Sequence, residues 1–186
     1  MRIIAGKFKG HRLQGVNDLS TRPATDLVKG SIFNCLQNRL SLDGANVLDI
    51  FAGTGSLGFE AISRGAARVV FIDNNKKAIK AIKENAFSLR CKEQCEIYCI
   101  DAFKYIQNNN EQFDLVFADP PYHYEYLEEL PMAIFRHHCV CEGGYLIIEH
   151  PQRIKYCKTE YYIPSIHKRF GNTCLTFFIH PQMEKD

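Results

Sequence analysis

Apolar and polar residues alternate along the middle of the chain in the pattern of alternating strands and helices. Short runs rich in β-branched residues are followed by segments with a helical spacing of apolar positions. The expected strands are 46–50, 68–72, 95–100, 113–118 and 144–149, and the expected helices are 57–64, 75–89, 102–107 and 124–135. Strands that alternate with helices form βαβ units, so the sequence predicts an α/β fold with a mostly parallel sheet.

The C-terminal part breaks this alternation. Residues 156–163 and 173–180 are both rich in aromatic and β-branched residues, and a turn region with Pro164 and Gly171 separates them. Two strands in direct succession favour an antiparallel, hairpin-like edge beside the parallel strands. The whole pattern predicts seven strands.

The N-terminal residues differ in character from this core. Apolar residues alternate with basic ones near turn glycines at 6 and 10, which predicts a small β-hairpin, and residues 23–40 have the apolar spacing of an amphipathic helix. We interpret 1–40 as a basic cap and 41–186 as the main domain. The cationic side chains are Arg2, Lys7, Lys9, Arg12 and Arg22. They suit contacts with nucleic-acid phosphates, although a solvated charged hairpin is the plainer alternative.

A glycine-rich turn follows the first expected strand. Gly53, Gly55 and Gly58 match the G-x-G-x-x-G pattern of dinucleotide-binding turns, and Asp73 lies 20 residues after the first of them. On this pattern alone, an NAD-dependent oxidoreductase remains open. Asp49 argues against it, because its carboxylate precedes the turn and would repel a pyrophosphate at the helix N-terminus.

Four expected strands are followed by, or end in, an aspartate, at positions 49, 73, 101 and 119. Such an acidic edge favours a cationic ligand without phosphate, and S-adenosylmethionine carries an ammonium and a sulfonium beside its ribose and adenine. We expect Asp49 to bind the amine, Asp73 the ribose hydroxyls and Asp101 the adenine amine. The other expected cofactor contacts are Phe51, Ala52, Gly53, Gly55, Asn74 and Ala102. Helix N-capping is the alternative role for any one of these aspartates.

The tetrapeptide Asp119-Pro120-Pro121-Tyr122 stands where a buried strand reaches the edge of its sheet. Two prolines remove two backbone donors and fix two φ angles, so the loop is stiff and rich in acceptors. Asp119 and the Pro120 carbonyl can each accept one N–H of an exocyclic amine while Tyr122 stacks on the ring that bears it. An ordinary turn is the alternative. We interpret these four residues as catalytic.

Composition and charge are those of an ordinary globular domain. The 186 residues are 46% hydrophobic and 24% charged, with a formal net charge of +2. No apolar run approaches a membrane span and no signal peptide is recognisable, so we expect a cytoplasmic protein. Separately, we expect a monomer. The eight cysteines contain no C-x-x-C pair, so we expect free thiols and no metal, although His137-His138-Cys139-Val140-Cys141 is the densest ligand-like cluster.

These motifs resemble those of a known family. Residues 49–55 and 119–122 look like the cofactor and amino-methylation motifs of Rossmann-like S-adenosylmethionine methyltransferases. More narrowly, residues 2–10, 22–26, 32–34 and 58–66 are similar to the bacterial RsmD family, which methylates the exocyclic N2 of one guanine in 16S ribosomal RNA. Leu27, Lys29 and Gly30 stand where that family usually has Arg, a basic residue and Glu, so a contact made through that Glu is not carried over to Gly30.

The resemblance implies a Rossmann-like α/β methyltransferase that uses S-adenosylmethionine, releases S-adenosylhomocysteine and needs no metal. Its partner would be 16S rRNA, within an assembling small ribosomal subunit, with residues 1–40 contacting the RNA. The catalytic loop reads an amine and not a particular base, so adenine-N6 methylation of DNA or RNA stays open as an alternative. A noncatalytic RNA-binding module is a further alternative, disfavoured by Asp49, Asp73 and Asp119.

Overall fold

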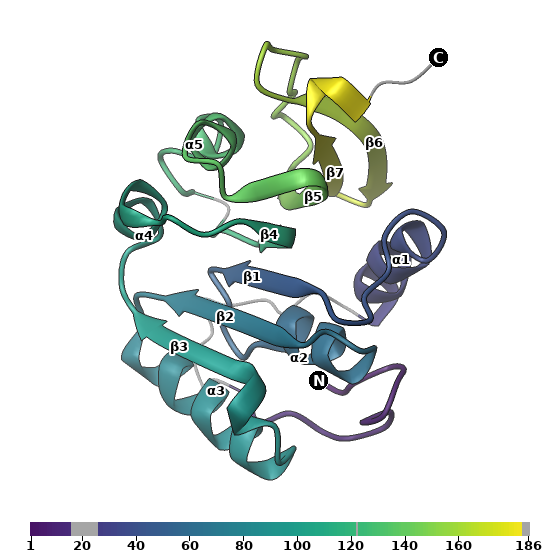
Figure 1. Cartoon of the computed structure of the whole chain (residues 1–186), viewed down its shortest axis with the longest axis vertical. Coiled ribbons are helices and arrows are strands. Elements are labelled where there is room, and N and C mark those ends of the chain that lie inside the picture. Colours follow the sequence, from purple (N-terminus) through teal and green to yellow (C-terminus); the bar gives the residue numbers. More distant parts are fainter. Residues whose placement is uncertain (16–25, 122, 184–186) are drawn as a thin grey trace. The chain divides into compact units, whose positions relative to one another are not determined.

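The computed structural model describes residues 1–15, 26–121 and 123–183. The chain forms two compact units, Met1–Ala102 and Phe103–Asp186. Among the described residues, seven strands and the helices between them follow the order expected from the sequence (Figure 1).

The first unit contains three parallel strands in the order β3-β2-β1. Its elements are α1 (Asp26–Leu36), β1 (Asn46–Ile50), α2 (Ser56–Ser63), β2 (Arg68–Asp73), α3 (Lys76–Ser88), the 3-10 turn η1 (Lys92–Gln94) and β3 (Cys95–Cys99). Helix α2 packs on β1 and β2, and α3 packs on β2 and β3 (Figure 1). The carboxyl ends of the three strands therefore share one edge, followed by the turns that lead into the helices.

Local sequence explains where these helices begin and how closely they pack. Asn75 caps α3 by accepting a hydrogen bond from the Lys77 amide, at 2.8 Å. Gly58 lets α2 approach β2, because a Cβ at this position would lie 2.3 Å from a ring carbon of Phe71. Gly58 is thus a packing glycine, which is one of the roles that glycine takes in such turns.

The N-terminal segment closes on itself with less strand pairing than the sequence predicts. Arg2 and Arg12 form one isolated antiparallel bridge, and the Ile3 amide donates to the His11 carbonyl at 3.0 Å. The antiparallel closure is confirmed, but no extended strands flank it because residues 5–10 fold as a compact turn. The expected helix at 23–40 is confirmed as α1, which is shorter; residues 23–25 lie outside the described residues.

The second unit contains the remaining four strands in the order β4-β5-β7-β6. Its elements are α4 (Ala102–Asn108), which begins at the boundary, β4 (Phe113–Ala118), α5 (Leu130–Arg136), β5 (Val140–Pro151), β6 (Ile163–Phe170), β7 (Thr173–Ile179) and η2 (Pro181–Met183). Strands β4 and β5 are parallel, whereas β7 is antiparallel to β5 and to β6. The predicted antiparallel C-terminal edge is confirmed.

Three predicted elements of this unit are wrong in their bounds. The strand expected at 144–149 is β5, which is longer at both ends. The strand expected at 156–163 is β6, which begins only at Ile163 and runs through Pro164. Proline is tolerated there because β6 is paired with β7 alone. The helix expected at 124–135 begins at Leu130, since Pro131 suits a first helical turn and residues 125–129 form turns.

The cores of both units consist of strand and helix side chains with little or no exposure. Phe59, Phe71 and Ile82 are fully buried in the first unit, and Phe117 and Phe178 in the second. Among the residues that the structure describes, no helix is long and apolar enough to cross a membrane.

Candidate functional site

The turn after β1 has an unusual backbone. Phe51, Gly53 and Gly55 have φ angles of 61°, 56° and 76°, all in the left-handed region. Glycine adopts this region readily, but a phenylalanine does so only where the surroundings enforce it. Such outliers concentrate at functional sites. The turn predicted from the glycine pattern therefore has a specific backbone conformation that the surrounding structure maintains.

Hydrogen bonds hold this turn in one conformation. The Gly53 amide donates to Asp73 Oδ2 at 2.8 Å, and the Ala52 amide donates to the Ile72 carbonyl at 3.0 Å. On the other side, the Asn85 side chain donates to the Thr54 carbonyl at 3.1 Å. These contacts tie the turn to the end of β2 and to α3, so a ligand would meet a backbone that is already ordered.

Asp49 lies beneath the turn and is only 2% exposed. Its Oδ2 accepts a hydrogen bond from the Gly58 amide, at 2.9 Å, in the first turn of α2. Burial raises the pKa of Asp49 to about 8, and the charge of Asp73 adds to the rise while the Gly58 bond opposes it. The Asp49 side chain thus accepts the hydrogen bond of a helix-terminal amide that would otherwise be available to the pyrophosphate of NAD. This arrangement disfavours the NAD interpretation.

Asp73 also serves the backbone around it. Its Oδ2 accepts from Gly53, and its Oδ1 accepts from the Asn75 amide at 2.8 Å. Each carboxylate oxygen has a second lone pair, so Asp73 can still accept from a ligand hydroxyl. Neither aspartate is the N-cap residue of a helix, because Gly55 precedes α2 and Asn75 caps α3, although Asp49 accepts from a first-turn amide of α2. These backbone hydrogen bonds do not exclude ligand contact.

The structure brings the expected cofactor residues of the first unit to one edge. β1, β2 and β3 run parallel, and the Ile100 amide donates to the Asp73 carbonyl at 3.1 Å, which joins the last two strand ends. Phe51, Gly53, Asp73 and Asp101 are partly exposed, Asn74 is exposed, and Ala52, Gly55 and Ala102 are buried. The donors and acceptors of this edge suit a ligand with an ammonium and hydroxyl groups.

The proline loop of the second unit directly follows β4, as the sequence predicts. Asp119 is partly exposed, Pro120 is buried and Pro121 is exposed. The Pro121 carbonyl accepts from the Tyr124 amide at 2.8 Å, so one turn closes the loop. Tyr122 lies outside the described residues.

An aromatic cluster that the sequence did not predict lies beside this loop. The Phe103 ring centroid is 5.4 Å from that of Tyr126 and 6.3 Å from that of Tyr124. Tyr126 is 45% exposed, although tyrosine rings usually bury much of their surface. The only signal in the sequence is the spacing of two tyrosines shortly after the prolines.

The predicted RNA-contacting residues are exposed but not equivalent. Arg2 donates to Asp26 at 2.9 Å, which offsets much of its charge. Lys7 donates to the Gln94 side chain at 2.9 Å and lies over the Phe8 ring. Lys9 and Arg12 are exposed, and Arg22 lies outside the described residues.

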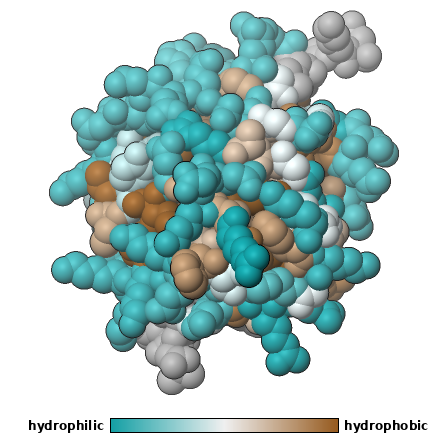
Figure 2. Space-filling view, turned by 60° about the horizontal axis from the view of Figure 1, so that its bottom comes forward, coloured by the Kyte–Doolittle hydropathy of each residue, from teal (hydrophilic) through white to brown (hydrophobic). Residues whose placement is uncertain are grey.

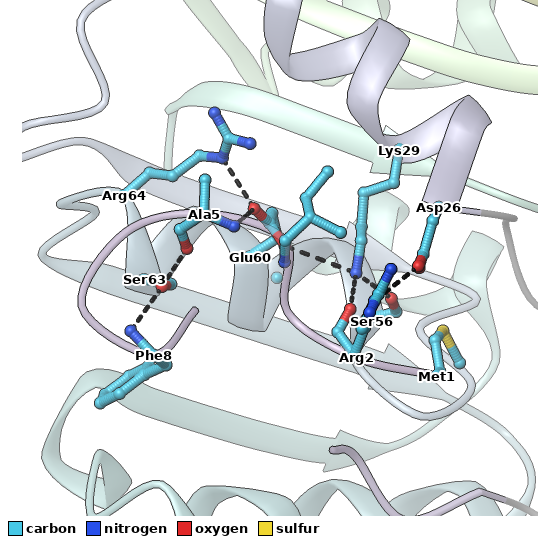
Figure 3. Close-up of polar contacts among 12 residues, drawn as sticks. Met1, Arg2, Ala5, Phe8, Asp26, Lys29, Ser56, Glu60, Ser63 and Arg64 are labelled. Carbon is cyan, nitrogen blue, oxygen red and sulfur yellow. Dashed lines mark hydrogen bonds and ion pairs between the residues drawn. The ribbon is translucent and has the colours of Figure 1, made fainter. Parts of the chain in front are cut away.

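A buried ion pair between α1 and α2 helps to hold the N-terminal segment (Figure 3). Lys29 Nζ lies 3.4 Å from Glu60 Oε2, and both side chains are fully buried. Glu60 also accepts from the Ile4 and Ala5 amides, at 2.8 and 3.0 Å, and from Arg64 Nε. The carboxylate of α2 therefore orders the start of the chain.

Lys29 completes this network from α1. Its ammonium donates to the Arg2 carbonyl at 2.6 Å and to Ser56 Oγ at 3.2 Å. Burial lowers the pKa of Lys29, and the Glu60 charge opposes that shift. A signal for this role exists in the sequence, because Lys29 occupies the apolar stripe that Ile32, Phe33 and Leu36 continue at helical spacing.

Comparison with known proteins agrees with this architecture. The chain is 36% identical over 163 residues to "Ribosomal RNA small subunit methyltransferase D" of Haemophilus influenzae, covering 86% of this chain and 79% of that protein. The solved "Putative methyltransferase yhhF" of Escherichia coli superposes with a TM-score of 0.84 at 25% identity, over 96% of both chains. SMU.776, solved with bound SAH, superposes with a TM-score of 0.67 at 14% identity, over 83% of this chain and 50% of that one.

These likenesses confirm the Rossmann-like methyltransferase fold predicted for the chain. The family model described as "Conserved hypothetical protein 95" matches residues 1–179, which is nearly the whole chain. The chain therefore belongs to this family, and the resemblance to RsmD drawn from its N-terminal and glycine motifs is confirmed.

Proposed function

We propose that this protein is an S-adenosylmethionine-dependent rRNA methyltransferase that acts on the exocyclic N2 amine of a guanine in 16S rRNA. The observation that carries the proposal is that one chain, related to small-subunit rRNA methyltransferases, has both an acidic glycine turn after β1 and an Asp-Pro-Pro-Tyr loop after β4. Residues 41–186 would be the catalytic domain, and residues 1–40 an RNA-contacting extension.

The acceptors at the edge of the first unit suit the ammonium and the hydroxyl groups of S-adenosylmethionine. Asp49 would bind the ammonium, Asp73 the ribose hydroxyls and Asp101 the adenine amine. The remaining contacts would come from Phe51, Ala52, Gly53, Gly55, Asn74 and Ala102. A Cβ at Gly53 would meet nothing nearer than 4.0 Å, so the space beside this backbone is open to a ligand. SAH bound to SMU.776, which shares the fold, supports S-adenosylmethionine as the cofactor.

When bound, S-adenosylmethionine supplies an electrophilic methyl group on a sulfonium. The task of the protein is then to position the acceptor amine, since little proton chemistry is needed before transfer. Asp119 and the Pro120 carbonyl would each accept one N–H, which turns the nitrogen lone pair out of conjugation. The amine nitrogen would take the methyl group as the carbon–sulfur bond breaks, and Asp119 or water would accept the extra proton afterwards.

The remaining loop residues would complete the acceptor site. Pro121 stiffens the loop through the turn that its carbonyl makes with Tyr124, and Tyr122 would stack on the target base. A guanine inside a helix is out of reach, so the enzyme would extrude it or act on unpaired RNA. Arg2, Lys7, Lys9, Arg12 and Arg22 would neutralise phosphates around the target. An assembling small ribosomal subunit would present this RNA.

The loop chemistry alone also allows adenine-N6 methylation, because it reads an amine and not a base. Incubating the protein with labelled S-adenosylmethionine, 16S rRNA and genomic DNA separates the two. We expect label in the rRNA, recovered as N2-methylguanosine after digestion to nucleosides. Label recovered as N6-methyladenosine, or found in DNA alone, would contradict the proposal.

A further inference from the structure

A groove of about 930 Å³ runs beside α3 and η1 in the first unit. Ile79, Ala86 and Ile97 give it an apolar floor, and Phe87 stands at its margin with 68% of its surface exposed. Figure 2 brings forward the side on which α3 lies in Figure 1 and shows hydrophobic atoms framed by hydrophilic ones. A phenylalanine side chain exposed to this degree keeps much of its apolar surface in water. A partner that covers Phe87 would gain the free energy of burying that surface.

The margins of this groove are strongly basic. They carry the four exposed lysines Lys76, Lys80, Lys83 and Lys92. Among its lining residues, all within the described part of the chain, Glu84 is the single acid, and it pairs with Lys80 at 3.8 Å. The Lys92 ammonium lies 4.8 Å from the centroid of the Phe87 ring. An ammonium beside an exposed aromatic ring suits a nucleotide, because the ammonium can bind its phosphate and the ring can stack on its base.

The groove is continuous with the basic N-terminal segment. His11 Nε2 lies 3.0 Å from Ser88 Oγ at the end of α3, and Lys7 donates to Gln94 of η1 at 2.9 Å. The Gln14 amide donates to Asn85 Oδ1 at 2.7 Å. Lys7, one of the residues predicted to contact RNA, is thus tied to η1, and His11 and Gln14 tie the N-terminal segment to α3 beside the groove. One strand of nucleic acid can therefore follow both.

We propose that this groove binds single-stranded RNA outside the methylated nucleotide, with phosphates on Lys83 and Lys92 and a base stacked on Phe87. This inference rests on the proposed function, because it extends the contact surface for the same RNA substrate. The other occupant that a basic apolar groove could take is an acidic amphipathic protein segment. RNA is favoured because the exposed ring is paired with a cation and because the groove continues the basic N-terminal segment.

The test is binding of a fluorescent single-stranded RNA of mixed sequence to the full chain, measured by anisotropy over a range of salt concentrations. The variants are Phe87→Ala and the double change Lys83→Gln with Lys92→Gln. Their matched controls are Tyr98→Ala, which also removes an exposed aromatic ring but one outside the groove lining, and Lys155→Gln with Lys158→Gln on exposed lysines elsewhere. Thermal melting verifies that each variant is folded.

We expect Phe87→Ala to weaken binding roughly 5- to 150-fold with an unchanged salt dependence, since it removes stacking. The double lysine variant should reduce the slope of log affinity against log salt by about 1.4, or about 0.7 for each lost phosphate contact. Groove variants that bind RNA as tightly as their controls overturn the proposal. An acidic Glu/Leu-rich helical peptide represents the other occupant. Groove variants that lose binding to this peptide but still bind RNA normally also overturn the proposal.

Methyl transfer to 16S rRNA, measured in parallel on the wild type, separates this proposal from the function on which it rests. Transfer by the wild type, together with groove variants that bind RNA normally, overturns the groove alone. Absence of transfer, together with groove variants that lose RNA binding, supports the groove and overturns the proposed function alone.

Discussion

Lys29 Nζ and Glu60 Oε2 lie 3.4 Å apart with both side chains fully buried, and together they fasten the start of the chain to α2. The pair is surrounded by further partners, because the Ile4 and Ala5 amides and Arg64 share the carboxylate. Charges that are buried this completely are stable only when fully paired. The N-terminal segment is therefore held by a network that loses most of its support if one member is removed.

The first prediction concerns that network. Glu60→Ala leaves the buried Lys29 ammonium without its counter-ion and two backbone amides without their acceptor, so we expect the free energy of unfolding to fall by about 3–5 kcal/mol. Urea unfolding followed by circular dichroism measures the change. The matched control is Glu84→Ala on α3, which breaks an exposed pair and should cost under about 1 kcal/mol. A Glu60→Ala variant no less stable than the Glu84→Ala variant would rule out this role.

The second prediction concerns cofactor binding and pH. Asp49 has a pKa of about 8 without ligand, and the ammonium of S-adenosylmethionine favours its ionised form. Binding below that pKa must therefore release a proton, so affinity should rise with pH up to about 8, by at most tenfold per pH unit. Calorimetry in buffers of different ionisation enthalpy counts the proton. Asp49→Asn should bind more weakly and without this component, and a variant that keeps the full pH dependence would refute the assignment.

The third prediction concerns stability without ligand and follows from the same group. Because the folded-state pKa of Asp49 lies above the unfolded value of about 4, the folded protein holds the proton more tightly. Asp49 therefore lowers the free energy of unfolding as pH rises from about 4 to about 8. Asp49→Asn should remove this decline, which denaturant titrations at several pH values can detect. Parallel curves for the two proteins would show that Asp49 titrates normally.

The fourth prediction separates two glycines of the same motif. Gly58→Ala places a methyl group against the Phe71 ring, so it should cost about 1–3 kcal/mol of stability. Gly53→Ala meets no atom nearer than 4.0 Å, but the left-handed φ of 56° should cost an alanine about 1–2 kcal/mol of stability. It also narrows the space beside the turn, so it should weaken S-adenosylhomocysteine binding as well. Gly15→Ala, at an open position without a positive φ, is the control. Weaker S-adenosylhomocysteine binding in Gly58→Ala than in Gly53→Ala would contradict this division.

Much of the fold could be predicted because its elements have strong local signals. β4 has the bounds expected from its apolar run, and α3 begins after Asn75 as its capping residue requires. The start of β6 could not be found this way. The aromatic residues before it resemble a strand, but the Thr159 hydroxyl accepts from the Tyr161 and Tyr162 amides, and this local turn replaces strand pairing.

The candidate site shows the same division between local and tertiary information. The aspartates and glycines of the turn follow directly from their positions after strands, and the structure brings Asp49, Asp73 and Gly53 together as expected. The Lys29–Glu60 pair depends on residues 31 positions apart that meet only through packing. No local pattern specifies that meeting, although a lysine in an apolar stripe indicates that a partner is needed.

The fifth prediction concerns Asp119, in the loop at the end of β4. Asp119→Ala should nearly abolish methyl transfer to 16S rRNA while it leaves S-adenosylhomocysteine affinity within a few-fold of the wild type, because Asp119 is assigned to the acceptor amine. Filter binding of labelled rRNA product gives the rate, and calorimetry gives the affinity. Activity retained in this variant would remove the proposed mechanism.

The most direct test of the whole account is calorimetry of the wild-type protein with S-adenosylmethionine, S-adenosylhomocysteine and NADH. The acidic glycine turn, in which Asp49 takes the Gly58 amide, predicts saturable binding of the first two ligands and none of NADH. Folded protein that gives no heat with S-adenosylmethionine and S-adenosylhomocysteine, or that binds NADH instead, would contradict the account.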